Sequence, residues 1–225
     1  MELSIDTSSN FAGIALSING EMFAEQIWQT ARNHSTELVP KIEQLLKQHA
    51  CTMQSCIAIM VATGPGSFNG LRVGVSAAKG FSLALNIPIV GINTPEIEAY
   101  GFAFSGLPIC SIHNAGREEI ATALYRQTDD WLCLQEPHIT TIDTLCQQTI
   151  EPTIFCGEIP ERALQQLHQK LGDRASIPET VHRIRHTSCL ATLGWRRFTK
   201  RSFDDPVTLQ PLYLRQPPIT QRKVK

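Results

Sequence analysis

The apolar and polar residues at the start of the chain are spaced as expected for three strands followed by a helix. We predict strands at three short segments, residues 2–7, 12–18 and 21–28. Asn19 and Gly20 separate the last two of these segments, and this dipeptide is the strongest short signal for a two-residue β-hairpin turn. Residues 33–48 are then predicted to form an amphipathic helix, with one side made by Leu38, Ile42, Leu45 and Leu46.

The stretch of residues 57–91 organises the rest of the sequence. It opens with a β-branched apolar run at residues 57–61, which predicts a buried strand, and it closes with a short strand at residues 87–91. Between them, a turn breaks the chain at Gly64, Pro65 and Gly66. A helix is predicted over residues 70–85, and its capping residue is Ser67 or Asn69.

The helix at residues 70–85 is unusual because Arg72 and Lys79 are its only charged residues. Small residues stand where long polar ones are usual: Gly70, Gly74, Ala77, Ala78, Gly80 and Ala84. A helix that is apolar on nearly all sides must be buried on all sides. Two interpretations stay open: a central core helix, or a helix with one side on the core and the other on a partner helix.

The order of strands and helices predicts an α/β fold with mixed sheets and helices on their faces. A linker at residues 93–95 leads into a helix through Tyr100, and we place a soft boundary near residue 100. The second half is expected to contain strands at 108–113, 120–125 and 153–156, and helices at 142–148, 160–171 and 188–200.

Composition indicates a globular protein with a sizeable core. The chain has 225 residues with 42% hydrophobic content, enough for one large or two small units. Its seven cysteines include no CxxC pair, so reduced, buried cysteines are expected instead of disulfides or a structural zinc site. No leader-like or membrane-spanning segment is apparent, and we expect a soluble, cytoplasmic protein without membrane contact.

Charge is unevenly distributed along the chain. The net charge is −1, but residues 182–225 hold ten Lys and Arg against two acids, which gives that segment a net charge of +8. Such asymmetry indicates a partner. Two explanations stay open: a solvated helix face with a frayed tail, or contact with RNA or an acidic protein. Trp195 and Phe198, one helical turn apart, are expected to anchor their helix to the core.

The sequence offers few candidates for catalysis. The glycine turn of Gly64, Gly66 and Gly70 suggests a phosphate loop, but Leu71 and Arg72 stand where a Walker motif requires Lys and Ser or Thr. The dinucleotide-binding and nucleophile-elbow spacings also fail. His182 and His186 form an HxxxH motif, but arginines lie between them, which disfavours a bound dication.

Five segments together closely resemble the TsaB (YeaZ) family: DTSS at 6–9, NHSTELVPKIEQLL at 33–46, GPGSFNGLRVGVSAAKG at 64–80, NIPIVG at 86–91 and PLYLR at 211–215. The resemblance is dense over the first hundred residues and returns only at the last segment. It implies an actin-like, sugar-kinase-like (ASKHA) fold of two related subdomains, residues 1–100 and 101–225.

The resemblance also implies a function in tRNA modification. Members of this family are non-catalytic paralogues that form a heterodimer with the transferase TsaD, and the small ATPase TsaE joins them. The complex makes threonylcarbamoyladenosine beside the anticodon of tRNAs that read codons starting with A. No cofactor is therefore expected in the isolated chain, because ATP and metal belong to the partner subunits. Exposed apolar helices would also allow the chain to form a homodimer in the absence of its partner.

Family interfaces use the first two helices, which correspond here to residues 33–48 and 70–85. The residues expected to contact the partner are His34, Glu37, Leu38, Lys41, Ile42, Leu45, Leu71, Arg72, Val75, Ala78, Lys79 and Ser82.

The resemblance also explains an expected loss of catalysis. Catalytic relatives carry HxxxH on the first helix to hold a metal, whereas here His34 is followed by Leu38, so no metal site is expected. A vestigial first phosphate loop is expected at Asp6, Thr7 and Ser8. Asn114 replaces a family aspartate. The alternatives are a metallopeptidase and a stand-alone nucleotide-binding protein that uses Asp6.

Overall fold

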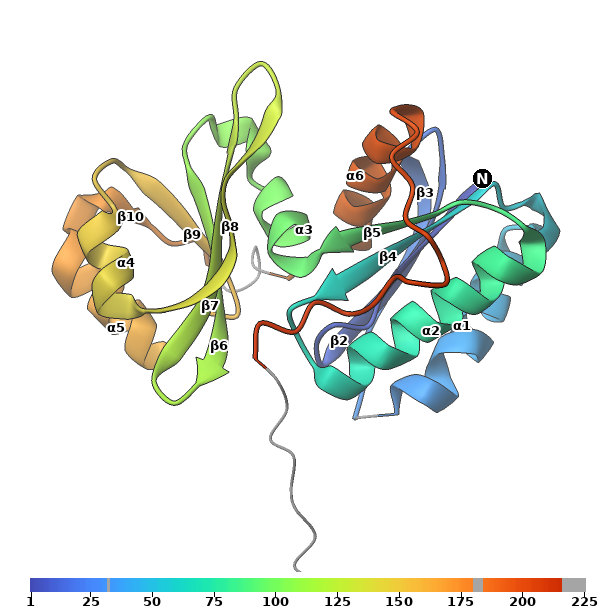
Figure 1. Cartoon of the computed structure of the whole chain (residues 1–225), viewed down its shortest axis with the longest axis horizontal. Helices are drawn as coiled ribbons and strands as arrows, with labels where there is room; N and C mark the ends of the chain where they lie inside the picture. Colours follow the sequence, from blue (N-terminus) through green and yellow to red (C-terminus); the bar gives the residue numbers. More distant parts are fainter. Residues whose placement is uncertain (32, 180–183, 216–225) are drawn as a thin grey trace, which may run out of the picture.

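The computed structural model describes residues 1–31, 33–179 and 184–215, which form two lobes lying side by side (Figure 1). Each lobe is built on a five-stranded sheet. The strands of the first sheet lie in the order β3-β2-β1-β4-β5, with bounds β1 Glu2–Asp6, β2 Phe11–Ile18, β3 Glu21–Gln29, β4 Ala58–Gly64 and β5 Ile89–Asn93. This sheet is mixed, because β2 pairs antiparallel with β1 and β3 whereas β4 runs parallel to β1 and β5.

The predicted hairpin between β2 and β3 is confirmed. Asn19 and Gly20 have φ angles of 55° and 76°. Positive φ at both central residues is what the favoured two-residue hairpin turn requires, and this is the reason that Asn-Gly is such a strong signal.

Helices cover both faces of the first sheet. Helices α1 (His34–Gln48) and α2 (Phe68–Leu85) lie on one face, and α6 (Thr187–Thr199) lies on the other (Figure 1). The core under α1 and α2 is aliphatic and includes Leu3, Ile5, Ile14, Leu38, Ile42 and Val75. The core under α6 includes Met60, Val90, Leu190 and Leu193.

The second sheet has the same mixed character. Its strands lie in the order β10-β9-β6-β7-β8, with bounds β6 Ile109–Gly116, β7 Glu119–Gln127, β8 Trp131–Thr141, β9 Thr153–Gly157 and β10 Ala175–Ser176. Helices α4 (Ile142–Gln148) and α5 (Glu161–Leu171) pack on one face, and α3 (Thr94–Tyr100), which leads from the first lobe to the second, packs on the other.

After the second sheet, the chain returns to the first lobe. Helix α6 packs against the first sheet, and the segment that follows it runs along α2 (Figure 1). Within this segment, Asp204 N donates to Ile89 O at 2.9 Å, and Leu212 N donates to Thr63 O at 2.7 Å. Helix α6 and the segment through Leu212 therefore contact the first lobe, although the predicted boundary groups them with the second subdomain.

Strand β8 is not predicted by the sequence pattern. It is an edge strand, and residues 132–136 are all exposed, so it has no alternation of buried and exposed positions that a pattern could show.

Of the two predicted caps for α2, the structure selects Ser67, whose Oγ accepts from Gly70 N at 3.3 Å. Among the described residues, no helix is both long and apolar enough to cross a membrane.

Candidate functional site

The glycine turn and the loop after β1 are packed directly against each other. Thr7 Oγ1 donates to Gly70 O at 2.7 Å, and Ser67 N donates to Ser8 O at 2.7 Å. A Cβ added to Gly66 would lie 2.2 Å from Ser8 O, and one added to Gly70 would lie 2.1 Å from Thr7 O. Glycine is therefore required at both positions, because the loop after β1 packs too closely to leave room for a Cβ atom.

A buried ion network lies where the two lobes meet. Its centre is Arg185, just before α6, whose Nε donates to Asp6 Oδ2 at 2.5 Å. Nη1 of the same guanidinium donates to Glu98 Oε1 at 2.6 Å, and Nη2 donates to Ser8 Oγ at 2.8 Å. The side chains of Arg185, Asp6 and Glu98 are only 6%, 5% and 3% exposed. Because water has little access to these side chains, the guanidinium and the two carboxylates must stabilise one another's charges.

Glu98 extends this network into the second sheet. Its Oε2 accepts from Ser111 Oγ at 2.6 Å and lies 2.8 Å from His113 Nε2. Burial disfavours the charged carboxylate, but His113 and Arg185 outweigh this effect and lower the pKa of Glu98 to about 2. Burial also disfavours the imidazolium, but the carboxylate of Glu98 outweighs it and raises the pKa of His113 above its ordinary value.

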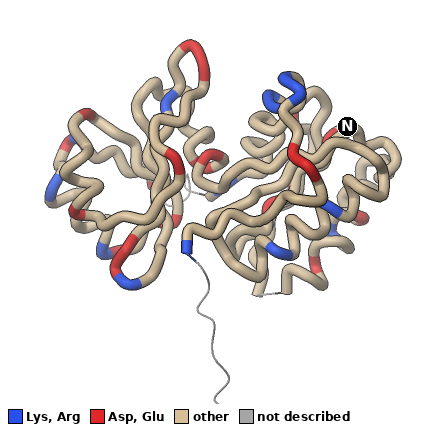
Figure 2. The backbone as a smooth tube through the Cα atoms, in the orientation of Figure 1, with Lys and Arg blue, Asp and Glu red and all other residues tan. Residues whose placement is uncertain are grey.

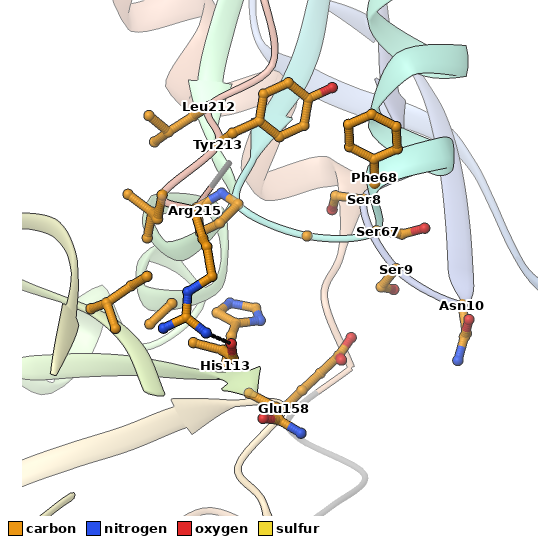
Figure 3. A pocket seen from close by; sticks show the side chains of 17 residues that line it. Ser8, Ser9, Asn10, Ser67, Phe68, His113, Glu158, Leu212, Tyr213 and Arg215 are labelled. Carbon is orange, nitrogen blue, oxygen red and sulfur yellow. Dashed lines mark hydrogen bonds between the residues drawn. The ribbon is translucent and has the colours of Figure 1, made fainter. Parts of the chain in front are cut away.

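A cavity of about 570 Å³ opens between the lobes beside this network (Figure 3). Ser8 and Phe68 line it from the first lobe, His113 and Glu158 from the second, and Tyr213 from the carboxyl-terminal segment. The rings of Phe68 and Tyr213 lie 5.1 Å apart, centroid to centroid. The cavity thus combines an aromatic wall with hydroxyl, imidazole and carboxylate groups.

Most of the predicted partner contacts are core residues in the structure. The side chains buried beneath α1 and α2 are His34, Leu38, Ile42, Leu45, Leu71, Val75, Ala78 and Ser82. A partner cannot reach them while the chain is folded. They are therefore corrected from contact residues to packing residues of the first lobe, because the apolar stripe of each helix faces the sheet.

The four remaining predicted contacts are charged, and all four interact within the chain. Glu37 accepts from Trp28 Nε1 at 2.9 Å, and Lys41 Nζ lies 4.9 Å from the centroid of the Trp28 ring. Lys79 Nζ donates to two carbonyls of the segment after α6, at 3.1 and 3.0 Å. Arg72 is exposed and lies over the Phe68 ring.

The outer face of α2 carries small and apolar residues that were not predicted as contacts, beside the exposed Arg72, which was. Leu83 is 57% exposed, and Ser76, Gly80 and Ala84 are also exposed. A Cβ added to Gly80 would meet no atom within 4 Å, so the packing of this chain does not require a glycine there. On α1, Val39 is 42% exposed.

The histidines that were weighed as metal ligands make other contacts within the chain where the structure describes them. His34 Nε2 lies 3.0 Å from a backbone oxygen of the loop after β1, and Leu38 is in the core. His186 lies 3.1 Å from Glu25 Oε2, whereas His182 is outside the described residues. In the part of the chain that the structure describes, no three His, Cys, Asp or Glu side chains are grouped to hold a metal ion.

Sequence reasoning missed Arg185, Glu98 and His113 as members of one site. Arg185 counted only as part of a basic segment, and no local pattern links it to Glu98, 87 positions away. One signal was available: Ser111 and His113 are polar and two apart on a predicted strand, so they point to the same face. Asn114, which replaces a family aspartate, accepts from Gly116 N at 2.8 Å and so shapes the β6–β7 turn.

The chain is similar in sequence to proteins of tRNA modification. A family model described as TsaD, tRNA N6-adenosine threonylcarbamoyltransferase, matches residues 21–170. The tRNA threonylcarbamoyladenosine biosynthesis protein TsaB of Bacillus subtilis is 32% identical over 95% of this chain and 93% of the relative. The protein of the same name from Escherichia coli is 29% identical over 44% of this chain and 42% of the relative.

The fold is shared with solved structures over nearly its whole length. A protein from Pseudomonas aeruginosa, described as similar to peptidase YEAZ, has a TM-score of 0.81 at 18% identity and covers 95% of this chain and 99% of its own. A ROK family protein from Streptococcus pneumoniae has a TM-score of 0.51 at 10% identity and covers 89% and 99%. The predicted actin-like, sugar-kinase-like fold of two mixed sheets flanked by helices is confirmed.

Proposed function

Because the chain belongs to the TsaB family of tRNA threonylcarbamoyladenosine biosynthesis proteins, we propose that it is a non-catalytic subunit that pairs with a TsaD transferase. The pair would modify the adenosine next to the anticodon in tRNAs that read codons starting with A. The observation that carries this proposal is the outer face of α2. Apolar surface left in water on a folded chain is typical of a protein interface.

The shape of this face favours a helix as the contacting element. Gly80 and Ala84 are four residues apart and therefore lie on one side of α2. Helices with small residues at their contact approach more closely than helices with large ones. Leu83, beside them, offers an exposed apolar side chain that could enter a groove on the partner.

The proposal that the chain is non-catalytic is supported by the contacts of the residues at the candidate metal and phosphate positions. Leu38 fills the core at the position where a second imidazole would be needed for a metal. Asp6, the carboxylate of the predicted phosphate loop, is bound by Arg185. ATP and metal would therefore be supplied by the partner subunits.

The proposal is tested by blocking the outer face of α2 without disturbing the core. Gly80→Arg places a long charged side chain where the structure has open space, and it replaces a poor helix former with a good one. We expect the purified variant to keep its circular dichroism spectrum. Its Kd for the cognate TsaD, measured by calorimetry, should rise at least about tenfold, a loss of roughly 1.4 kcal/mol.

Ile150→Arg is the matched control, because Ile150 is 82% exposed and follows α4 in the second lobe. It adds the same charge and similar bulk away from α2, and it should bind like the parent. Equal binding by the parent, Gly80→Arg and Ile150→Arg would rule out the outer face of α2 as the contact surface.

We extend the proposal to the other members of the complex. TsaE would join the assembled pair, and tRNA would be reached through the complex. Lys and Arg gather at the end of α6 (Figure 2), and the exposed members there are Arg196, Lys200 and Arg201. Such a cluster can contact phosphates, with binding that weakens as salt increases.

The outer face of α2 would also allow a homodimer in the absence of TsaD. We place the complex in the cytoplasm.

A further inference from the structure

Arg185 stands between two cavities of the interlobe region. The cavity of about 570 Å³ reaches the network at Ser8 and His113. A second cavity, of about 510 Å³, is lined by Glu98 and Arg185 among the described residues. The ion network therefore connects the two lobes in a region with a cavity on each side of it.

The contacts of Arg185 cross from one lobe to the other. Asp6 and Ser8 lie at the end of β1 in the first sheet, whereas Glu98 is on α3, which packs on the second sheet. Glu98 continues the connection to Ser111 and to His113 on β6. One guanidinium thus links β1 to α3 and, through a single carboxylate, to β6.

The network is balanced in charge only when Arg185 is present. Asp6 and Glu98 are buried carboxylates, and Arg185 and His113 are the cations that face them. Without Arg185, two carboxylates would share a buried region with one imidazole. A buried charge that has lost its partner is strongly unfavourable, so water would enter and the lobes would separate.

We propose that Arg185 is a positioning residue that latches the two lobes together. Its guanidinium occupies the polar site between Asp6 and Glu98 and so fixes the separation of the sheets. This inference concerns the chain alone, and it stands or falls independently of any pairing with TsaD.

The test compares Arg185→Gln with Arg162→Gln on the isolated chain. Arg162 is a suitable control because it is 67% exposed and pairs with Glu118 inside the second lobe. X-ray scattering should show a larger radius of gyration for Arg185→Gln only. Amide exchange should become at least about tenfold faster in α3 and at the end of β1, while the core of each sheet keeps its protection.

A second variant separates latching from general destabilisation. Asp6→Asn combined with Arg185→Gln removes both members of one ion pair, so no uncompensated carboxylate remains at that position. Its unfolding midpoint should recover toward that of the parent, but its radius of gyration should stay large. If the double variant scatters and exchanges like the parent, other contacts hold the lobes together, and the latch is overturned. This variant also serves if Arg185→Gln alone does not fold.

Discussion

Glu98 and His113 form a buried pair whose protonation depends on their surroundings. His113 is 8% exposed and faces the carboxylates of Glu98 and Glu158 and the guanidinium of Arg185. The pKa of Glu98 is lowered to about 2, and that of His113 is raised, so the pair is carboxylate and imidazolium at pH values between these two pKa values. The two residues join α3 to β6, and their ionisation therefore contributes to the stability of the second lobe.

This pair gives stability a defined pH dependence. Glu98 contributes above its ordinary pKa of 4.5, and its contribution is lost as pH falls toward 2. His113 contributes fully below its ordinary pKa of 6.5, and its contribution is lost as pH rises through the raised folded value. His113→Gln should therefore lower the free energy of unfolding by about 1 kcal/mol at pH 6 and by clearly less at pH 9.

Urea denaturation at the two pH values measures this difference. His168→Gln is the control, because His168 is exposed on α5, and it should change neither value. An equal loss for His113→Gln at pH 6 and pH 9 would show that His113 acts only through packing.

Helix α2 has two faces with different roles. Its inner face is part of the core, where Val75 is 3% exposed and Ala78 is fully buried. Its outer face carries Gly80, Leu83 and Ala84 in contact with water. The buried inner face fits both interpretations drawn from the composition of this helix, and the binding of a partner to the outer face stays a prediction.

Neighbouring positions on α2 should respond differently to the same substitution. Val75→Glu buries a carboxylate without a partner and should cost roughly 3 kcal/mol or more of folding free energy. Ser76→Glu, one residue later, adds the same group to an exposed site and should leave the thermal midpoint within about 2 °C of the parent. Equal midpoints for the two variants, measured by circular dichroism, would contradict the burial assigned to Val75.

How far the sequence predicts this structure depends on how local the signals are. The elements of the first lobe are marked by nearby residues, such as Asn19-Gly20 at the hairpin and Ser67 before α2, and they were predicted. Strand β8 was not predicted, because an exposed edge strand has no buried face. The network around Arg185 was not predicted either, because Arg185 and Asp6 are 179 positions apart and only the fold brings them together.

The molecule as a whole is two lobes joined by ion pairs at two levels. The interior connection is buried, through Arg185 and Glu98, whereas Arg215 of the carboxyl-terminal segment donates to Ala115 O and pairs with Glu119 at the surface. Leu212 N donates to Thr63 O in the first lobe, so the PLYLR segment bridges the lobes. Because the lobes are joined at two places, α2 is held in a fixed position relative to the second lobe. A fixed position suits the proposed pairing with a partner subunit.

Titration of the parent protein with its cognate TsaD, followed by calorimetry, tests the central claim most directly. The account predicts saturable binding near one to one, with a Kd of about 1 µM or tighter. The same mixture should elute as a larger species from a sizing column. Absence of heat and of any elution shift at about 50 µM of each protein would contradict the claim that this chain is half of a heterodimer.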